Sequence, residues 1–175
     1  LVDAPGHFQG EPVLLDLEDL WTMADDGPRP KRTMTTEQMK TAIENGLHSS
    51  PWSDPKPGAH VARAAKSYMH SQVEAGHGCP ITMTFAVVPA LRVQADLAAQ
   101  WEPLITARHY DPRNVPAEQK SGITVGMAMT EKQGGSDVRA NTTRAYPVGA
   151  AGPGQAYELV GHKYFVSAPM CDAFL

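Results

Sequence analysis

The feature that most constrains the fold is a change in the spacing of apolar residues near Ser121. Before this point, apolar residues recur every three or four positions, which is typical of helices. After it, apolar residues from Ile123 to Met129 alternate with small or polar ones, which is typical of a strand. The chain therefore runs from helices to strands, and this order predicts an α+β arrangement or two adjoining domains.

Four segments before the change have helical spacing and stop signals. The first predicted helix is capped by Thr36 and runs towards Leu47. The other three are Ala59–Ala75, Ile81–Val88 and Leu91–Ile105. The second carries an apolar stripe that includes Val61, Tyr68 and Val73. The third is apolar on every side, so we expect it to be buried and to be kinked or ended by Pro89.

Three segments after the change read as strands. They are Ile123–Thr130, Thr142–Val148 and Tyr157–Val166, the last two joined by a glycine-rich loop. The final residues, Asp172 to Leu175, look like the opening of a further strand. Both ends of the chain look cut, so we expect a fragment of a longer protein. The domain limits we predict are 1–33 for a loop-rich arm, 34–120 for a helical domain and 121–175 for the start of a β-domain.

Composition and charge exclude several classes of protein. The 175 residues include 15 Lys and Arg against 19 Asp and Glu, giving a net charge of −4, and 42% are hydrophobic. The whole net charge falls in residues 1–33, which also hold a short amphipathic stretch, Val13–Met23. In residues 34–175 the basic and acidic residues are equal in number, and the basic ones form no stripe that could bind nucleic acid. The longest apolar runs are too short to span a bilayer. No secretory signal can be read in residues 1–8, so we expect a cytoplasmic protein. Cys79 and Cys171 lack CxxC spacing, and in a reducing compartment we expect both to be buried thiols.

The segment Gly126–Asp137 holds most of the chemical information. Thr130 brings a hydroxyl to the end of the first strand, and Gly134, Gly135 and Ser136 follow with unhindered amides that can converge on an anion. The segment is neither a Walker loop nor a dinucleotide fingerprint. A Gly-Gly-Ser bend between strands is more often only a turn, so the residues alone leave the phosphate cradle and the plain turn both open.

A second segment, Tyr157–Ser167, carries two neighbouring aromatics, Tyr164 and Phe165. It can lay apolar surface against a planar ring. Taken alone, its alternation favours a half-buried strand packed on the helices. A site that holds both a planar ring and its phosphates requires the bend and this aromatic pair to lie close together.

Together the two segments resemble a known family. MAMTEKQGGSD and YELVGHKYFVSAP resemble the paired middle-domain signatures of the acyl-CoA dehydrogenase family, and CPITMTFAVVPAL, followed by MTEKQGGSDVRANTTRA, resembles its AidB branch. The resemblance spans about residues 34–175. It implies an α+β fold in which a helical N-terminal domain precedes an incomplete antiparallel β-domain. Lys132 and Gln133 stand where many members have a proline, which favours the AidB branch.

The resemblance also implies FAD, bound between the β-domain and a C-terminal helical bundle. In the family the threonine hydroxyl reaches towards flavin N5, the two small residues of the bend meet the pyrophosphate, and the second segment covers the other side of the ring. The residues expected to contact FAD are Met127, Met129, Thr130, Gly135, Ser136, Phe165, Val166 and Ser167.

The reaction implied is oxidation of an acyl-CoA thioester at its α,β bond, with hydride transfer to flavin N5. The family's catalytic carboxylate comes from the C-terminal bundle, so we expect no catalytic residue in this chain, and we expect Glu131 to be structural and on the solvent side. The family implies homotetramers. The alternative is a DNA-associated flavoprotein that protects against alkylation damage, with its basic surface outside this chain. We expect no metal site, because His70 and His77 have no third ligand at a matching spacing.

Overall fold

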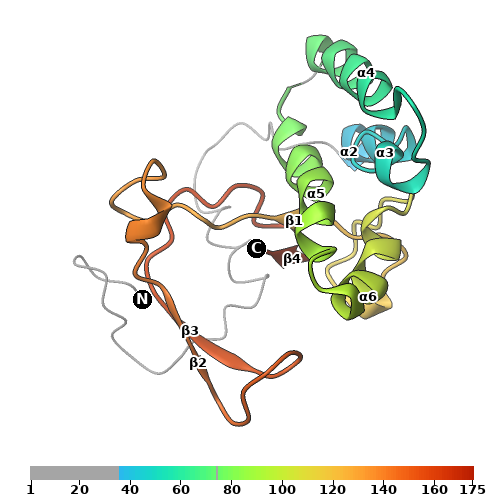
Figure 1. Cartoon of the computed structure of the whole chain (residues 1–175). Coiled ribbons are helices and arrows are strands. Elements are labelled where there is room, and N and C mark those ends of the chain that lie inside the picture. Colours follow the sequence, from blue (N-terminus) through green and yellow to red (C-terminus); the bar gives the residue numbers. More distant parts are fainter. Residues whose placement is uncertain (1–35, 74) are drawn as a thin grey trace. The chain divides into compact units, whose positions relative to one another are not determined.

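A computed structural model describes residues 36–73 and 75–175 (Figure 1). The predicted arm, 1–33, and its stretch Val13–Met23 lie outside the described residues. The described residues group into two compact units. We call 36–127 with 167–175 the helical unit and 128–166 the hairpin unit.

The four predicted helices are confirmed in the helical unit. Its elements before the first strand are α2 (Thr36–Glu44), α3 (Ser50–Ser53), α4 (Ala59–Val73), α5 (Gly78–Leu91), α6 (Ala95–Ile105) and a 3-10 turn, η1 (Ala117–Gln119). The helix α5 continues through Pro89. A proline cannot donate to the carbonyl four residues earlier, that of Phe85. The indole N–H of Trp52 donates to this carbonyl at 2.9 Å, which satisfies it and joins α3 to α5.

The apolar stripe of α4 lies on the outside of the helical unit. Val61, Tyr68 and Val73 are 73%, 72% and 86% exposed. The opposite side of the helix packs through a polar residue, since Arg63 donates to the Leu47 carbonyl at 2.7 Å and places its guanidinium 3.7 Å from the Phe85 ring centre. α4 is therefore held to its unit by hydrogen bonds and a cation–π contact more than by its apolar face.

A short sheet joins the end of the chain to the helices. β1 (Val125–Gly126) and β4 (Ala173–Phe174) pair in parallel, with Val125 opposite Ala173. The expected strand at Asp172–Leu175 is thus confirmed, although this pair is parallel and not antiparallel. The predicted strand Ile123–Thr130 is regular only over two residues, because its partner is equally short. A Cβ on Gly126 would collide with the Phe174 ring, so this close approach requires glycine.

The core of the helical unit lies where α5 and α6 meet β1. Its fully or nearly fully buried members are Val87, Val88, Leu91, Ala98, Ile105, Ile123 and Val125. A second cluster joins α2 to Ile81 of α5. Thr84 of α5 hydrogen-bonds both the amide and the carbonyl of Val125, at 3.0 and 3.4 Å, which fixes β1 on the helix.

A buried ion pair fastens the last residues. Lys120 lies 2.5 Å from Asp172, and both side chains are largely buried. Asp172 also accepts from the Thr124 amide at 2.8 Å. The end of the chain is therefore held beside β1 by charge and hydrogen bonds as well as by the strand pair.

The hairpin unit is built on an antiparallel ribbon. β2 (Arg144–Pro147) pairs with β3 (Tyr157–Val160), with Arg144 opposite Val160, and a 3-10 turn, η2 (Val138–Ala140), precedes it. The predicted strand Tyr157–Val166 ends at Val160, where β2 offers no further partner. The α+β class is confirmed, and the domain limits 34–120 and 121–175 stay a prediction. Within the described ranges, no helix combines the length and apolar character that crossing a bilayer requires.

Candidate functional site

Six of the eight residues expected to contact a flavin belong to the hairpin unit. They are Met129, Thr130, Gly135, Ser136, Phe165 and Val166. The other two, Met127 and Ser167, are the residues of the helical unit at which the chain passes into and out of the hairpin unit. The expected set is therefore divided by the unit boundary.

Thr130 and the aromatic pair lie on neighbouring segments. The Tyr164 amide donates to the Thr130 carbonyl at 3.0 Å, and the next residue, Glu131, forms an antiparallel bridge with Lys163. These contacts bring together two sequence segments that are more than thirty residues apart. The proximity that a site for a planar ring and its phosphates requires is present in the structure.

The small-residue bend folds back on Thr130. The Gly134 amide donates to the Glu131 carbonyl at 2.9 Å, and Gly134 has φ of +117°, which favours glycine. At Gly135, a Cβ would lie 2.9 Å from the Thr130 hydroxyl oxygen, so the absent side chain makes room for that hydroxyl. The amides of Gly135 and Ser136 are hydrogen-bonded to no other described residue. Exposed, unengaged amides of this kind fit an anion such as a pyrophosphate.

Apolar side chains beside the bend are open to solvent. Met129 is 50% exposed, Phe165 82% and Val166 36%. Phe165 also has φ of +65°, an unfavourable value for an aromatic residue. The preference for a half-buried strand over Tyr157–Ser167 is therefore wrong, because the strand stops early and most of its side chains are exposed. Exposed apolar surface next to unengaged amides fits a ligand with one flat apolar part and one anionic part.

The expectation that the Glu131 side chain is on the solvent side is wrong. It is only 2% exposed, and its carboxylate accepts from the amides and hydroxyls of Thr142 and Thr143 at 2.5 to 3.1 Å. Lys163 is a further partner at 3.2 Å. These hydrogen bonds, above all that from the Thr143 hydroxyl, hold the pKa of Glu131 far below its usual range. The structural role is confirmed, since one carboxylate ties the bend, the start of β2 and the segment before Tyr164 together.

The two cysteines differ in their surroundings. Cys79, at the start of α5, is exposed, so the prediction of a buried thiol is wrong there. Cys171 is buried as expected, and burial raises the pKa of its thiol to about 11. A thiol of this kind is protonated at neutral pH and is a packing residue.

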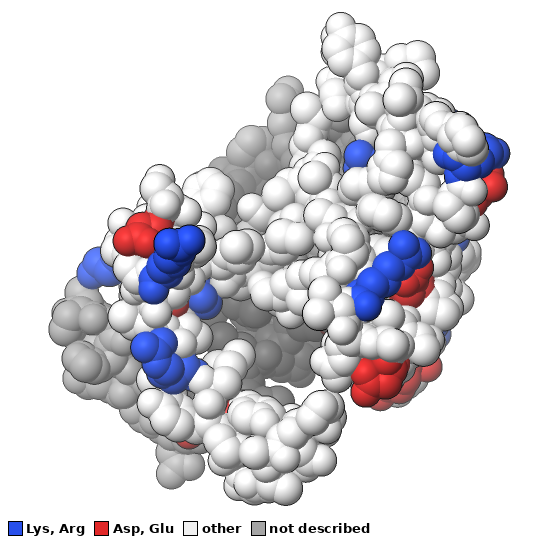
Figure 2. All heavy atoms as spheres, viewed as in Figure 1, with Lys and Arg blue, Asp and Glu red and all other residues white. Residues whose placement is uncertain are grey.

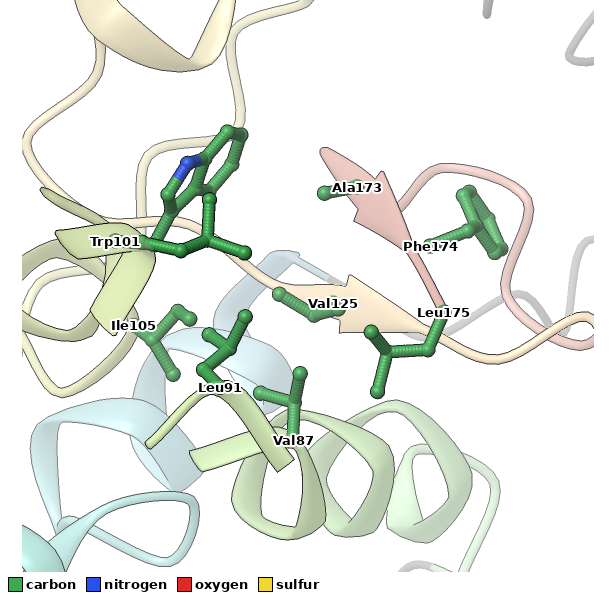
Figure 3. A pocket seen from close by; sticks show the side chains of 9 residues that line it. Val87, Leu91, Trp101, Ile105, Val125, Ala173, Phe174 and Leu175 are labelled. Atoms are coloured by element: carbon green, nitrogen blue, oxygen red, sulfur yellow. The ribbon is translucent and has the colours of Figure 1, made fainter. Parts of the chain in front are cut away.

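The helical unit contains an apolar pocket that the sequence did not reveal. It has a volume of about 180 Å³ and lies between α5, α6, β1 and the last residues of the chain (Figure 3). Its walls include Leu91, Trp101, Val125 and Phe174, and none of its lining residues is ionisable. The pocket can therefore accept a hydrocarbon group but supplies no acid or base. Its lining comes from elements distant in sequence, which is why periodicity alone could not identify it.

Comparisons with known proteins agree on one family. The family described as Adaptive response protein AidB N-terminal domain matches residues 36–112. A protein of Escherichia coli (strain K12), named "Putative acyl-CoA dehydrogenase AidB", is 47% identical over 139 residues, which is 78% of this chain. That stretch is 25% of the relative, so the chain spans about a quarter of its length.

Two solved structures resemble the chain in fold. The apo form of Bd2924 superimposes with a TM-score of 0.65 at 30% identity, over 78% of this chain and 26% of that one. ACDH-11 of Caenorhabditis elegans, solved in complex with C11-CoA, superimposes with a TM-score of 0.62 at 27% identity, over 78% of this chain and 22% of that one. The signatures, the fold and the sequence identity agree, and the chain belongs to the acyl-CoA dehydrogenase family, in its AidB branch.

Proposed function

We propose that the protein binds FAD and oxidises an acyl-CoA thioester at its α,β bond. The observation that supports this most strongly is the position of Thr130 in the hairpin unit. Its carbonyl is bonded to Tyr164, and its hydroxyl lies against Gly135 in a bend with unengaged amides. A flavin needs both an apolar surface for its ring and donors for its pyrophosphate, and these residues offer both within one unit.

Each residue has a distinct part in this proposal. The Thr130 hydroxyl, which is hydrogen-bonded to no other described residue, donates to the flavin ring, and the amides of Gly135 and Ser136 bind the pyrophosphate. The exposed side chains of Met129 and Phe165 exclude water from the ring. The remaining proposed contacts are Met127, Val166 and Ser167. When bound, FAD supplies the hydride acceptor.

The substrate class belongs to the same proposal. The worm relative was solved with C11-CoA, and we propose a thioester with an apolar acyl group for this protein too. A pocket with only apolar walls supports a substrate that has a hydrocarbon part. The base that removes the α-proton is expected outside this chain. A homotetramer and a cytoplasmic setting are further parts of the proposal.

Two substitutions in the intact protein test the flavin contacts separately. Thr130→Val removes the hydroxyl and keeps the shape, so we expect retained flavin but a shifted reduction potential. Gly135→Ala forces a methyl group towards the Thr130 hydroxyl, so we expect a lower flavin content, measured by absorbance. Gly149→Ala is the matched control, because a Cβ there meets nothing within 4 Å. Unchanged flavin content together with an unchanged potential in Thr130→Val would contradict the proposal.

The alternative function is protection of DNA against alkylation, with flavin as a structural group. The matched family's description as an adaptive response protein supports it. On the face in Figure 2, however, Lys and Arg side chains form separate groups, several beside Asp or Glu. Basic and acidic residues also balance over 34–175, so we expect a DNA surface elsewhere in the protein. A gel-shift assay distinguishes the cases: binding by residues 36–175 alone would contradict this charge argument.

A further inference from the structure

Two histidines meet where α4 ends and α5 begins. His70 is in the last turn of α4, and His77 is the residue before α5. Their Nε2 atoms are in direct contact, with ring centres 4.4 Å apart and ring planes at 72°. His77 is 1% exposed, whereas His70 is half-buried and reachable from solvent. Neither residue takes part in the proposed flavin contacts.

Two imidazole nitrogens that face each other need a positive particle between them. One proton can join them, since one ring then donates and the other accepts, but two protons cannot fit. A metal ion can replace that proton, because neutral imidazole nitrogen is among the commonest metal ligands in proteins. Metal–nitrogen bonds of about 2.0–2.1 Å place two ligand nitrogens on one ion about 3 Å apart. His70 is the half-buried member of the pair, so we expect its ring to make the adjustment to this separation.

The contact between the two Nε2 atoms, which the sequence spacing did not reveal, reverses the expectation of no metal site. We propose that His70 and His77 form a two-histidine site for a late first-row transition-metal ion, with water in the remaining positions. Imidazole favours Cu²⁺, Ni²⁺ and Zn²⁺, and Cu²⁺ binds most tightly in this series. Within residues 36–73 and 75–175, no third His, Cys, Asp or Glu completes a group with this pair. Imidazole nitrogens do not suit Mg²⁺ or Ca²⁺, which require oxygen ligands.

An ion bound by the two histidines would stabilise the turn between α4 and α5. The Gly78 amide donates to the Ala75 carbonyl at 3.1 Å, so a tight turn connects the two helices at this point. An ion held by one ring from each side of the turn cross-links the end of α4 to the start of α5. Because such an ion binds the folded state and not the unfolded one, it raises the melting temperature.

The test is a Cu²⁺ titration of the intact, metal-free protein, followed by electron paramagnetic resonance. We expect one Cu²⁺ with hyperfine coupling to two nitrogens, and affinity about tenfold weaker or worse in His70→Ala. His109→Ala, at an exposed histidine, is the matched control and keeps the affinity. Cys79→Ser keeps it too, which distinguishes the pair from the exposed thiol two residues later.

A second measurement covers the buried partner. His77→Ala removes a buried ring and can weaken folding, so it is not used as the test. Instead, the increase in melting temperature on adding Zn²⁺ is compared between the wild type and His70→Gln, which changes the half-buried residue of the pair. We expect the increase in the wild type and its loss in His70→Gln. Equal Cu²⁺ affinity in wild type and His70→Ala overturns the proposal. So does the absence of two-nitrogen coupling at Cu²⁺ up to about 1 mM, a concentration that would detect even weak binding.

Discussion

The two units of the molecule are stabilised in opposite ways. In the helical unit, apolar side chains such as Val88 and Ile105 are 0% exposed and form a continuous core. Among the described residues of the hairpin unit, the one buried side chain is a carboxylate, that of Glu131. The first unit therefore depends on apolar burial, and the second on hydrogen bonds to a charge.

This difference explains where a ligand can bind. The helical unit buries the apolar residues of α5 and α6 and exposes the stripe of α4, and it offers an apolar pocket. The hairpin unit keeps its apolar residues exposed, and one face of its ribbon shows this clearly. Leu159 opposes Ala145 and Tyr157 opposes Pro147, so these four residues share a face, and all are exposed. Apolar surface left open in this way is typical of a binding region.

The largest effect is expected from the core of the helical unit. Ile105→Ala leaves a cavity beside α5 and β1, and we expect a loss of about 2–5 kcal/mol in the free energy of unfolding. Urea unfolding followed by circular dichroism measures it. Val93→Ala is the control, since Val93 is 89% exposed and the change should stay within about 0.5 kcal/mol. Equal losses in both variants would mean that this unit does not depend on apolar burial.

Acid should weaken the helical unit before the hairpin unit. His48 is 1% exposed and donates to the Ala107 carbonyl at 2.9 Å. Burial lowers its pKa from 6.5 to about 4, so the unfolded chain takes up a proton first as the pH falls. Stability from His48 is present above pH 6.5 and is lost on the way to pH 4. This predicts a loss of about 2 kcal/mol between pH 7 and pH 5.

Urea titrations at pH 7 and pH 5 measure this change. His48→Gln keeps a donor for the Ala107 carbonyl but cannot titrate, so its stability should be nearly the same at the two values. A wild type that is equally stable at pH 7 and pH 5 would show that His48 takes up its proton without unfolding the unit.

The sequence predicted the helices well because their signals are local. The stripe at Met39, Ile43 and Leu47 and the all-apolar run of α5 need no knowledge of distant residues, and both are buried as their patterns indicate. Strand lengths were overestimated because a strand lasts only as long as its partner. Alternation continues to Thr130, but β4 offers only Ala173 and Phe174 for pairing.

For the candidate site, the sequence predicted which segments lie close together but not the hydrogen bonds that hold them, and the flavin contacts stay a prediction. Thr130, the bend and the aromatic pair were all selected from the sequence, and they do lie close together. The structural role of Glu131 was predicted but its burial was not, because its four hydrogen bonds come from Thr142 and Thr143, eleven and twelve residues later. A carboxylate shortly before two consecutive threonines was a weak signal. The contact between His70 and His77 likewise depends on the turn that joins their helices.

Glu131→Gln tests whether hydrogen bonds to the Glu131 carboxylate stabilise the hairpin unit. The substitution removes the charge that accepts four hydrogen bonds, so we expect faster amide hydrogen exchange at Thr142 and Thr143. Exchange in α5 should not change, because apolar contacts hold that helix. In the wild type the depressed pKa of Glu131 implies that its contribution is present above about pH 4.3, the ordinary value, and is lost as the pH falls below it. Hydrogen exchange by mass spectrometry at pH 7 and pH 4 checks both statements.

The smallest effect on stability is expected for a substitution in α4, because this helix of the helical unit exposes its apolar stripe. Val61 of α4 is 73% exposed and Val88 of α5 is 0% exposed, so the same change to alanine separates exposure from residue type. Val88→Ala should cost about 2 kcal/mol through lost burial and a cavity. Val61→Ala should stay within about 0.5 kcal/mol, because it removes no buried surface and alanine favours helices. Urea unfolding of the two variants measures both. If Val61→Ala costs as much as Val88→Ala, the apolar stripe of α4 is covered in the protein, and the helical unit buries more apolar surface than its own packing reveals.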